Sequence, residues 1–359
     1  FLLFGGLTLP FIGLDRALGV LTGTPGYRMV LYGPLSMLSY LHLAAQQGIL
    51  VKDGRSLELL QEVDTVVFDK TGTLTLDQPF VSGIYAGAGF SEEAVLTYAA
   101  AAETKQSHPI ARAILEAAAA RGITLPAIED AAYEIGYGIQ VRLDGKLILV
   151  GSRRFMAMRK IALPTAMQVL QDDAHHAGHS LVLVAVDGEL AGAITLQPTL
   201  RPEAKTIVQQ LRARGLQLYI ISGDHDAPTR RLATELGMDS YFAEVLPEDK
   251  ADLVKQLQDQ GRKVCFIGDG INDSIALKSA NVSISLHGAT TIAIDTAQII
   301  LMDGDLAQLP RIFCLADEFA ANMRVNFLAA TVPCIVIIGG ALFLGWGLLP
   351  SLILYQVSV

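Results

Sequence analysis

The chain has 359 residues, a net charge of −9 and a hydrophobic content of 51%, with a mean hydropathy of +0.41. This hydropathy is too high for an ordinary soluble enzyme and indicates membrane-embedded segments. The acidic balance, without a basic stripe, argues against a nucleic-acid partner. The three cysteines form no CxxC pair, so the sequence indicates neither a disulfide framework nor a zinc knuckle.

Apolar residues gather at both ends of the chain. Residues 1–14, 29–51 and 325–359 contain no Asp, Glu, Lys or Arg. Because a membrane-spanning helix needs about 20 apolar residues, we expect partial transmembrane helices within residues 1–50. Further transmembrane helices are expected within 325–359, the first over 325–344 and the last truncated. Both ends of the sequence lie inside apolar runs, which predicts a piece of a longer protein.

Between these ends, short apolar runs alternate with helical patterns, as in a parallel α/β sheet. Proline favours the first turn of a helix and glycine the position just past its end, which sets the expected boundaries. Strands are expected at 63–68, 217–221, 263–267 and 282–285. Helices are expected to begin at Pro202, Ala227 and Pro247 and to end at Gly215, Gly237 and Gly261.

Residues 77–196 have a different texture and are predicted to form an inserted α+β domain. An alanine-rich helical pair is expected at 91–121. Strand-like stretches follow, with Asp-Gly pairs at 144–145 and 187–188. Such pairs favour tight turns between antiparallel strands.

The stretch DKTGTLT begins at Asp69, directly after the first predicted strand. Asp69 therefore lies at the carboxyl edge of the predicted sheet, where open α/β folds bind ligands. A carboxylate there can attack the γ-phosphoryl of ATP and form an aspartyl phosphate, provided that a cation shields the two anions.

Three further motifs also fall at strand ends or helix starts. In GDGIND at 268–273, Asp269 and Asp273 supply hard oxygens suited to Mg²⁺. SGD occupies 222–224, and Lys250 ends LPEDK at 246–250. The lysine is a compact positive charge suited to a transferring phosphate.

In this order, the four motifs resemble the signature set of the P-type ATPases within the haloacid-dehalogenase superfamily, over nearly the whole chain. The resemblance implies an α/β fold whose haloacid-dehalogenase-like, Rossmann-like phosphorylation domain covers 51–76 and 197–304. It also implies an inserted nucleotide-binding domain at 77–196, a connecting helix at 305–324 and flanking transmembrane helices.

The same resemblance implies ATP and Mg²⁺ as cofactors. Mg²⁺ is expected among Asp69, the carbonyl of Thr71 and Asp269. The residues expected to carry the phosphoryl chemistry are Asp69, Lys70, Thr71, Thr73, Gly223, Asp224, Lys250, Asn272 and Asp273.

The residue type at position 71, a threonine, distinguishes a pump from a simple phosphatase. Phosphatases of the superfamily resemble one another in carrying a second Asp two places after the nucleophile, where it acts as general acid and base. Thr71 holds that place here, so the aspartyl phosphate is expected to persist. P-type ATPases remove it with the Glu of a TGE loop in an actuator domain, and the sequence contains no TGE.

The inserted domain is expected to bind the nucleotide. In the heavy-metal branch of the family, a Glu five residues before a His-Pro pair, followed by GxG, lines the adenine pocket. The matching residues are Glu103, His108, Pro109, Gly136 and Gly138. A plain surface histidine and an ordinary GxG turn remain the structural alternatives.

The transport segment departs from the family. Counting back from residues 48–54, the Cys-Pro-Cys position falls on Pro25, Gly26 and Tyr27, so both thiols that select soft metals are missing. Pro25-Gly26 is still expected to break the helix and leave carbonyls for an ion. Arg28 is either a functional residue within the membrane or a residue whose side chain snorkels to the membrane surface. Cys334 is either a cargo ligand or a packing residue.

Two functions remain open from the sequence. The favoured one is a multi-pass membrane pump with cytoplasmic catalytic domains, driven by ATP and moving a transition-metal cation. It requires lipid and the actuator domain of the same protein. Its rival is a related membrane protein that has lost metal transport and moves another cargo or regulates. A soluble phosphatase is a distant third.

Overall fold

The computed structural model describes residues 2–24, 26–76, 78–134, 138–269, 273–286 and 296–357. The chain divides into two compact units. One unit comprises Phe1–Val63 together with Gln298–Val359, and the other comprises Asp64–Ala297.

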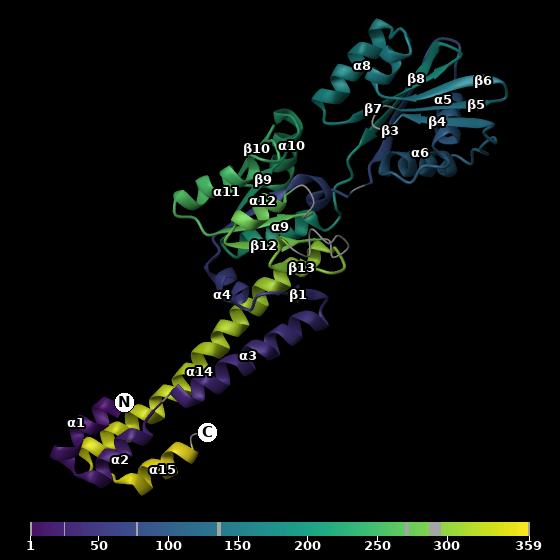
Figure 1. Ribbon diagram of the computed structural model, residues 1–359. Helices are drawn as coiled ribbons and strands as arrows, with labels where there is room; N and C mark the ends of the chain where they lie inside the picture. The colour runs from purple at the N-terminus through teal and green to yellow at the C-terminus, as the bar shows by residue number, and fades with distance from the viewer. Residues whose placement is uncertain are drawn as a thin grey trace. The chain divides into compact units, whose positions relative to one another are not determined.

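The first unit is mainly helical. Its helices are α1 (Leu2–Ile12), α2 (Leu14–Thr22), α3 (Gly26–Gln46), α4 (Arg55–Glu62), α14 (Leu309–Phe343) and α15 (Leu348–Val357), with a 3-10 turn η2 (Leu306–Gln308). Strands β1 (Ile49–Val51) and β13 (Ile299–Leu301) pair antiparallel. Helices α3 and α14 lie side by side (Figure 1).

Helix α14 (Leu309–Phe343) covers two elements that were predicted separately from the sequence. The expected connecting helix at 305–324 and the expected span at 325–344 are largely one continuous helix, because nothing in the sequence stops the helix between them. Within the described residues, the segment Leu306–Phe343 is the one helix that meets the length and composition of a membrane span, with a mean hydropathy of 2.1 over an 18-residue window.

The second unit contains a parallel sheet with strand order β12-β11-β2-β9-β10. Its strands are β2 (Thr65–Asp69), β9 (Gln217–Ile221), β10 (Ser240–Phe242), β11 (Val264–Gly268) and β12 (Val282–Ser285). Its helices are α9 (Ala204–Ala213), α10 (Asp226–Leu236), α11 (Lys250–Asp259) and α12 (Ser274–Ser279). A core that includes Val67, Val254 and Phe266 fixes the helices against the sheet.

The predicted strands and helices of this sheet are confirmed, with shifts at the helix starts. Strands 217–221 and 282–285 have the predicted bounds. Gly215, Gly237 and Gly261 take positive φ just past their helices, as the glycine rule requires. Helices α9 and α11 begin two and three residues after the predicted prolines, because turns occupy those positions.

The inserted segment forms an antiparallel sheet with strand order β3-β8-β7-β6-β5-β4. Its strands are β3 (Phe80–Ala86), β4 (Asp130–Glu134), β5 (Gly138–Leu143), β6 (Lys146–Gly151), β7 (Ser180–Val186) and β8 (Glu189–Gln197). Its helices are α5 (Glu92–Glu103), α6 (Pro109–Ala120), α7 (Arg153–Met158) and α8 (Thr165–His176). Helices α6 and α8 lie on opposite sides of the sheet (Figure 1).

Local sequence explains this sheet well. Asp144 and Gly145 have φ of 51° and 73°, and Asp187 and Gly188 have φ of 48° and 89°. Positive φ at both central residues is the geometry of two-residue hairpin turns. Both predicted turns are therefore confirmed, joining β5 to β6 and β7 to β8.

Candidate active site

Asp69 ends β2 at the carboxyl edge of the parallel sheet and is only 4% exposed. The neighbouring strand β9 ends opposite it, because Asp69 pairs with Ile221. After Asp69 the chain makes an irregular turn over Lys70–Leu74, in which Gly72 has a φ of 73°. Arg201 donates a hydrogen bond to the Gly72 carbonyl at 3.3 Å. Parallel strands thus bring the predicted nucleophile to the edge where the other motifs also arrive.

Lys250, at the start of α11, lies between two buried carboxylates. Its Nζ donates to Asp69 Oδ1 at 2.5 Å and to Asp273 Oδ1 at 2.6 Å. The side chains of all three residues are less than a tenth exposed. Charge-assisted hydrogen bonds of this kind are strong and directional. The lysine therefore fixes the orientation of Asp69 toward the space at the sheet edge.

Burial dominates the electrostatics of this cluster. It raises the pKa of Asp69, and the Asp273 carboxylate raises it further, while Lys250 lowers it. Burial also raises the pKa of Asp273 against the effect of Lys250. Burial alone would lower the pKa of Lys250, but Asp69 and Asp273 outweigh it and the pKa is raised. Negative charge thus exceeds what one lysine can balance.

The cluster fits a divalent cation. Asp273 Oδ2 is buried and has no hydrogen-bond partner within the described residues. An oxygen ligand with excess negative charge around it is what Mg²⁺ prefers, and Mg²⁺ commonly keeps several waters beside one or two carboxylates. In the described part of the chain, no group of three or more His, Cys, Asp or Glu is arranged to hold a metal ion. Asp69 and Asp273 would therefore contribute charge to a Mg²⁺ site completed by water and phosphate oxygens, and the ligand set of Asp69, the Thr71 carbonyl and Asp269 stays a prediction.

Other predicted residues surround the same edge. Asp224, which follows β9, forms an ion pair with the buried Lys70, whose pKa burial lowers. Gly223 is exposed beside it. The Thr73 hydroxyl is buried and has no hydrogen-bond partner among the described residues, so it is available to a ligand. Asn272 lies outside the described residues.

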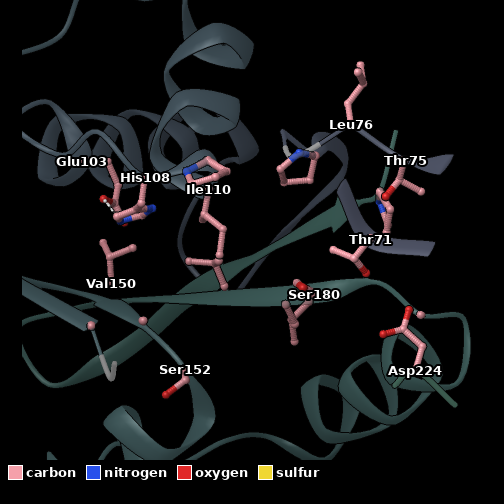
Figure 2. Close-up of a pocket in the computed structure, with 18 of the residues that line it drawn as sticks. Thr71, Thr75, Leu76, Glu103, His108, Ile110, Val150, Ser152, Ser180 and Asp224 are labelled. Atoms are coloured by element: carbon pink, nitrogen blue, oxygen red, sulfur yellow. Dashed lines mark ion pairs between the residues drawn. The ribbon is translucent and has the colours of Figure 1, made fainter. Parts of the chain in front are cut away.

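A cavity of about 650 Å³ extends from this edge to the inserted sheet. Thr71 and Asp224 lie at one end of it, and Glu103 and His108 lie at the other (Figure 2). Sites for small ligands commonly have volumes of about 300 to 1,000 Å³. The cavity therefore has room for a nucleotide reaching toward Asp69.

Glu103 and His108 form an oriented pair at the far end. His108 caps α6, and its Nδ1 accepts a hydrogen bond from the Ala111 amide at 3.1 Å. Nδ1 is thus unprotonated, and the neutral ring carries its proton on Nε2, which lies 3.2 Å from Glu103 Oε2. Burial raises the pKa of Glu103 to about 7 and lowers that of His108.

Glycine at 138 has a packing reason. A Cβ there would lie 2.5 Å from both the Phe155 ring and the Val150 carbonyl. Gly138 and Pro109 both line the cavity, whereas Gly136 lies outside the described residues. The structure thus explains one glycine of the predicted GxG by close approach rather than by turn geometry.

Sequence reasoning missed Ser152 and Ser180, which also line the cavity (Figure 2). Ser152 caps α7 by accepting a hydrogen bond from the Phe155 amide at 3.3 Å. A serine three residues ahead of that amide is a recognisable cap signal, but it indicates a helix start rather than a pocket. Ser180 begins β7 and carries no local signal at all.

The transport residues lie in the first unit. The helix breaks as predicted, since α2 ends at Thr22 and α3 begins at Gly26. The Thr22 and Thr24 hydroxyls donate to the carbonyls of Gly19 and Leu21 at 2.7 and 2.8 Å, and coordination of an ion by carbonyls at this break stays a prediction. Pro25 and the side chain of Tyr27 lie outside the described part of the chain.

Arg28 is buried in the first turn of α3. Its guanidinium donates to the Tyr355 carbonyl and lies 4.3 Å from the centre of the Tyr355 ring on α15. Cys334 is buried on α14, where its Sγ contacts the Ala330 carbonyl of the preceding turn at 3.1 Å. Arg28 therefore links two helices, and Cys334 makes a contact within its own helix.

Comparison with known proteins places the chain in a family. The family described as haloacid dehalogenase-like hydrolase matches residues 63–281. The manganese-exporting P-type ATPase of Mycobacterium leprae is 36% identical over 317 residues, which are 88% of this chain and 43% of that protein. The chain thus spans less than half of this relative's length.

Two solved structures resemble the chain. The crystal structure of a zinc-transporting PIB-type ATPase in the E2.Pi state has a TM-score of 0.79 and 33% identity, covering 92% of this chain and 54% of that one. The catalytic domain of the CPx-ATPase CopB-B, studied upon nucleotide binding, has a TM-score of 0.62 and 29% identity, covering 76% of this chain and 98% of that one. P-type ATPases use ATP and Mg²⁺. The chain therefore belongs to the haloacid dehalogenase-like hydrolases and, among them, to the P-type ATPases of the heavy-metal branch.

Proposed function

We propose that this chain is the catalytic and part of the membrane portion of an ATP-driven pump for a transition-metal cation. The observations that carry the proposal are the buried cluster of Asp69, Lys250 and Asp273 and a nucleotide-sized cavity lined by Lys70 and Thr71, the residues that follow Asp69. Its relatives that export manganese or transport zinc support a metal cation as cargo. These relatives carry different metal ions, so we propose only the class of the cargo, a transition-metal cation, and not its identity.

Phosphoryl transfer follows from the positions of these side chains. A carboxylate oxygen of Asp69 attacks the γ-phosphorus, the bond to the β-γ bridging oxygen breaks, and ADP leaves with that oxygen. Lys250 lowers the pKa of Asp69 against the effect of burial and offsets charge on the transferring group. Asp69, the Thr71 carbonyl and Asp269 would hold Mg²⁺, which would supply charge neutralisation. The Thr73 hydroxyl is available to donate to a phosphoryl oxygen.

The aspartyl phosphate then has to persist. Thr71, two places after the nucleophile, lines the cavity and bears a hydroxyl that cannot act as a general base. We propose that an actuator domain outside this sequence supplies the hydrolytic Glu, and that the catalytic residues lie on the cytoplasmic side of a lipid membrane crossed several times. A long-lived intermediate is what couples ATP chemistry to a conformational change.

Acid-stable labelling with γ-³²P-ATP tests the nucleophile. The wild-type chain in detergent with Mg²⁺ is expected to incorporate label that hydroxylamine removes, as an acyl phosphate requires. Asp69→Asn should abolish labelling while ATP still binds. Asp239→Asn, a matched change at the start of β10 outside the cavity, should leave labelling intact. Retained labelling in Asp69→Asn would remove Asp69 from the mechanism.

A second function is favoured by Arg28. A buried guanidinium in the helix bundle, held by Tyr355, repels a cation or acts as a fixed counter-charge, and intramembrane arginine commonly marks function. The alternative is therefore a P-type ATPase-like protein that moves another cargo or regulates. ATPase rates of the full-length protein in lipid, with Zn²⁺, Cu⁺, Mn²⁺ or Co²⁺ added singly, separate the two. Equal rates for all ions favour the alternative.

A further inference from the structure

Two histidines far apart in sequence meet outside the catalytic cluster. His175 lies in the last turn of α8 in the inserted domain, and His225 immediately precedes α10 beside the parallel sheet. Their Nε2 atoms are 3.3 Å apart and their ring centroids 4.4 Å apart. Both side chains are exposed, so an ion in solution can reach them.

Glu244 sets the tautomer of His225. Its Oε1 lies 2.9 Å from His225 Nδ1. A carboxylate accepts hydrogen bonds, so Nδ1 carries the proton and Nε2 of the neutral ring presents a lone pair toward His175. A carboxylate on the far nitrogen of a histidine is the usual support of a metal-binding imidazole.

Glu244 is itself held in position. Its backbone has a φ of 57°, a conformation that few residues other than glycine adopt. Its amide donates to the Asp224 carbonyl at 2.8 Å, and this hydrogen bond fixes the turn that carries the carboxylate. The support for His225 is thus built into the loop that follows β10.

The spacing of the two nitrogens matches a metal chelate. Two imidazole nitrogens bound to one tetrahedral Zn²⁺ lie about 3.3 Å apart. For both lone pairs to point at one ion, the two rings have to rotate while their nitrogens keep this separation, which exposed side chains allow. Since no group of three or more potential ligands occurs among the described residues, water would complete the coordination.

We propose that His175 and His225 bind one divalent transition-metal ion of the class that prefers imidazole, such as Zn²⁺ or Cu²⁺, with Glu244 supporting His225. The ion would tie the end of α8 to the start of α10. Close packing already exists there, because a Cβ on Gly178 would lie 2.6 Å from Pro228 Cβ. The expectation that this metal link would slow turnover rests on the proposed function. The expectation that the two histidines bind a metal ion does not.

Isothermal titration of the full chain in detergent with Zn²⁺, in excess Mg²⁺ to saturate the catalytic cluster, tests the site. One saturable Zn²⁺ equivalent that depends on His175 and His225 is expected. His175→Ala and His225→Ala should each weaken binding at least tenfold, and Glu244→Gln about tenfold. His176→Ala, the exposed neighbour on α8, is the control and should bind as wild type does.

Electron paramagnetic resonance with Cu²⁺ supplies a readout that does not depend on affinity. Nitrogen couplings from two imidazoles are expected in the wild type and from one in either single variant, with circular dichroism showing an unchanged fold. Absence of saturable binding, equal loss of binding in His176→Ala, or two imidazoles remaining in His225→Ala would each overturn the proposal.

Discussion

Glu103→Gln should stabilise the inserted domain in a pH-dependent manner. Glu103 is only 5% exposed, and burial raises its pKa from 4.5 to about 7. The folded state therefore holds a proton that the unfolded chain has already released between these two values. The stabilisation from that proton is complete below pH 4.5 and is lost as the pH rises through 7.

The size of the effect follows from the two pKa values. At about 1.4 kcal/mol for each pH unit, their difference corresponds to about 3 kcal/mol. Glutamine has the same shape and no charge, and its carbonyl can face His108 Nε2 as the Glu103 carboxylate does. Glu103→Gln should therefore match the wild type near pH 4.5 and exceed its stability by up to about 3 kcal/mol at pH 8.5.

Hydrogen exchange of the full chain in detergent measures this locally. Amides of α5 should exchange up to about a hundredfold more slowly in Glu103→Gln than in the wild type at pH 8.5, after correction for intrinsic rates, and similarly at pH 5. Glu92→Gln, at the exposed start of the same helix, serves as the control and should show little change. A difference between wild type and Glu103→Gln that does not vary with pH would refute the reasoning.

Three substitutions test the site around Asp69. Lys250→Met leaves two buried carboxylates without their shared cation and should lower the free energy of unfolding by about 3 to 5 kcal/mol. Added Mg²⁺ should stabilise the variant more than the wild type, and equal stabilisation of the two would contradict this. Gly72→Ala forces a Cβ into a φ of 73° and should cost about 1 to 2 kcal/mol and slow γ-phosphate incorporation, so an unchanged melting temperature would count against it. Thr73→Val removes a buried hydroxyl without a partner in the described structure; calorimetry should show no loss of stability, whereas rapid-quench phosphorylation should slow, and an unchanged rate would exclude a contact with phosphate.

The residues at the carboxyl edge of the parallel sheet were predictable because the sequence motifs that place them are local. Asp69 and the glycine of SGD each follow a short apolar run, and parallel strands necessarily bring such ends together. The Asp-Gly turns at 144–145 and 187–188 were predictable for the same reason, since positive φ at both positions restricts the residue types. Helix starts were less accurate, because prolines mark a first turn that need not be helical.

Contacts across long sequence separations were not predictable. Lys250 could be assigned to Asp69 only through the resemblance, since 181 positions separate them. Ser180 reaches the cavity through the register of β7 with β6 and β8, which no single stretch of sequence specifies. The link between Arg28 and Tyr355 depends on how α3 and α15 pack, and the sequence showed only that the arginine lies among apolar residues.

Burial of Asp69 serves two requirements that conflict in solution. An exposed carboxylate would ionise readily, but water would also reach the phosphate that it carries. Burial raises the pKa of Asp69, and Lys250, at 2.5 Å, counters this without admitting water. The same lysine also binds Asp273, so negative charge still exceeds positive charge, and this excess favours Mg²⁺. An ionised nucleophile in a nearly dry site would thus need both the lysine and a metal ion, and under the proposed function another residue brought to the site would release the phosphate.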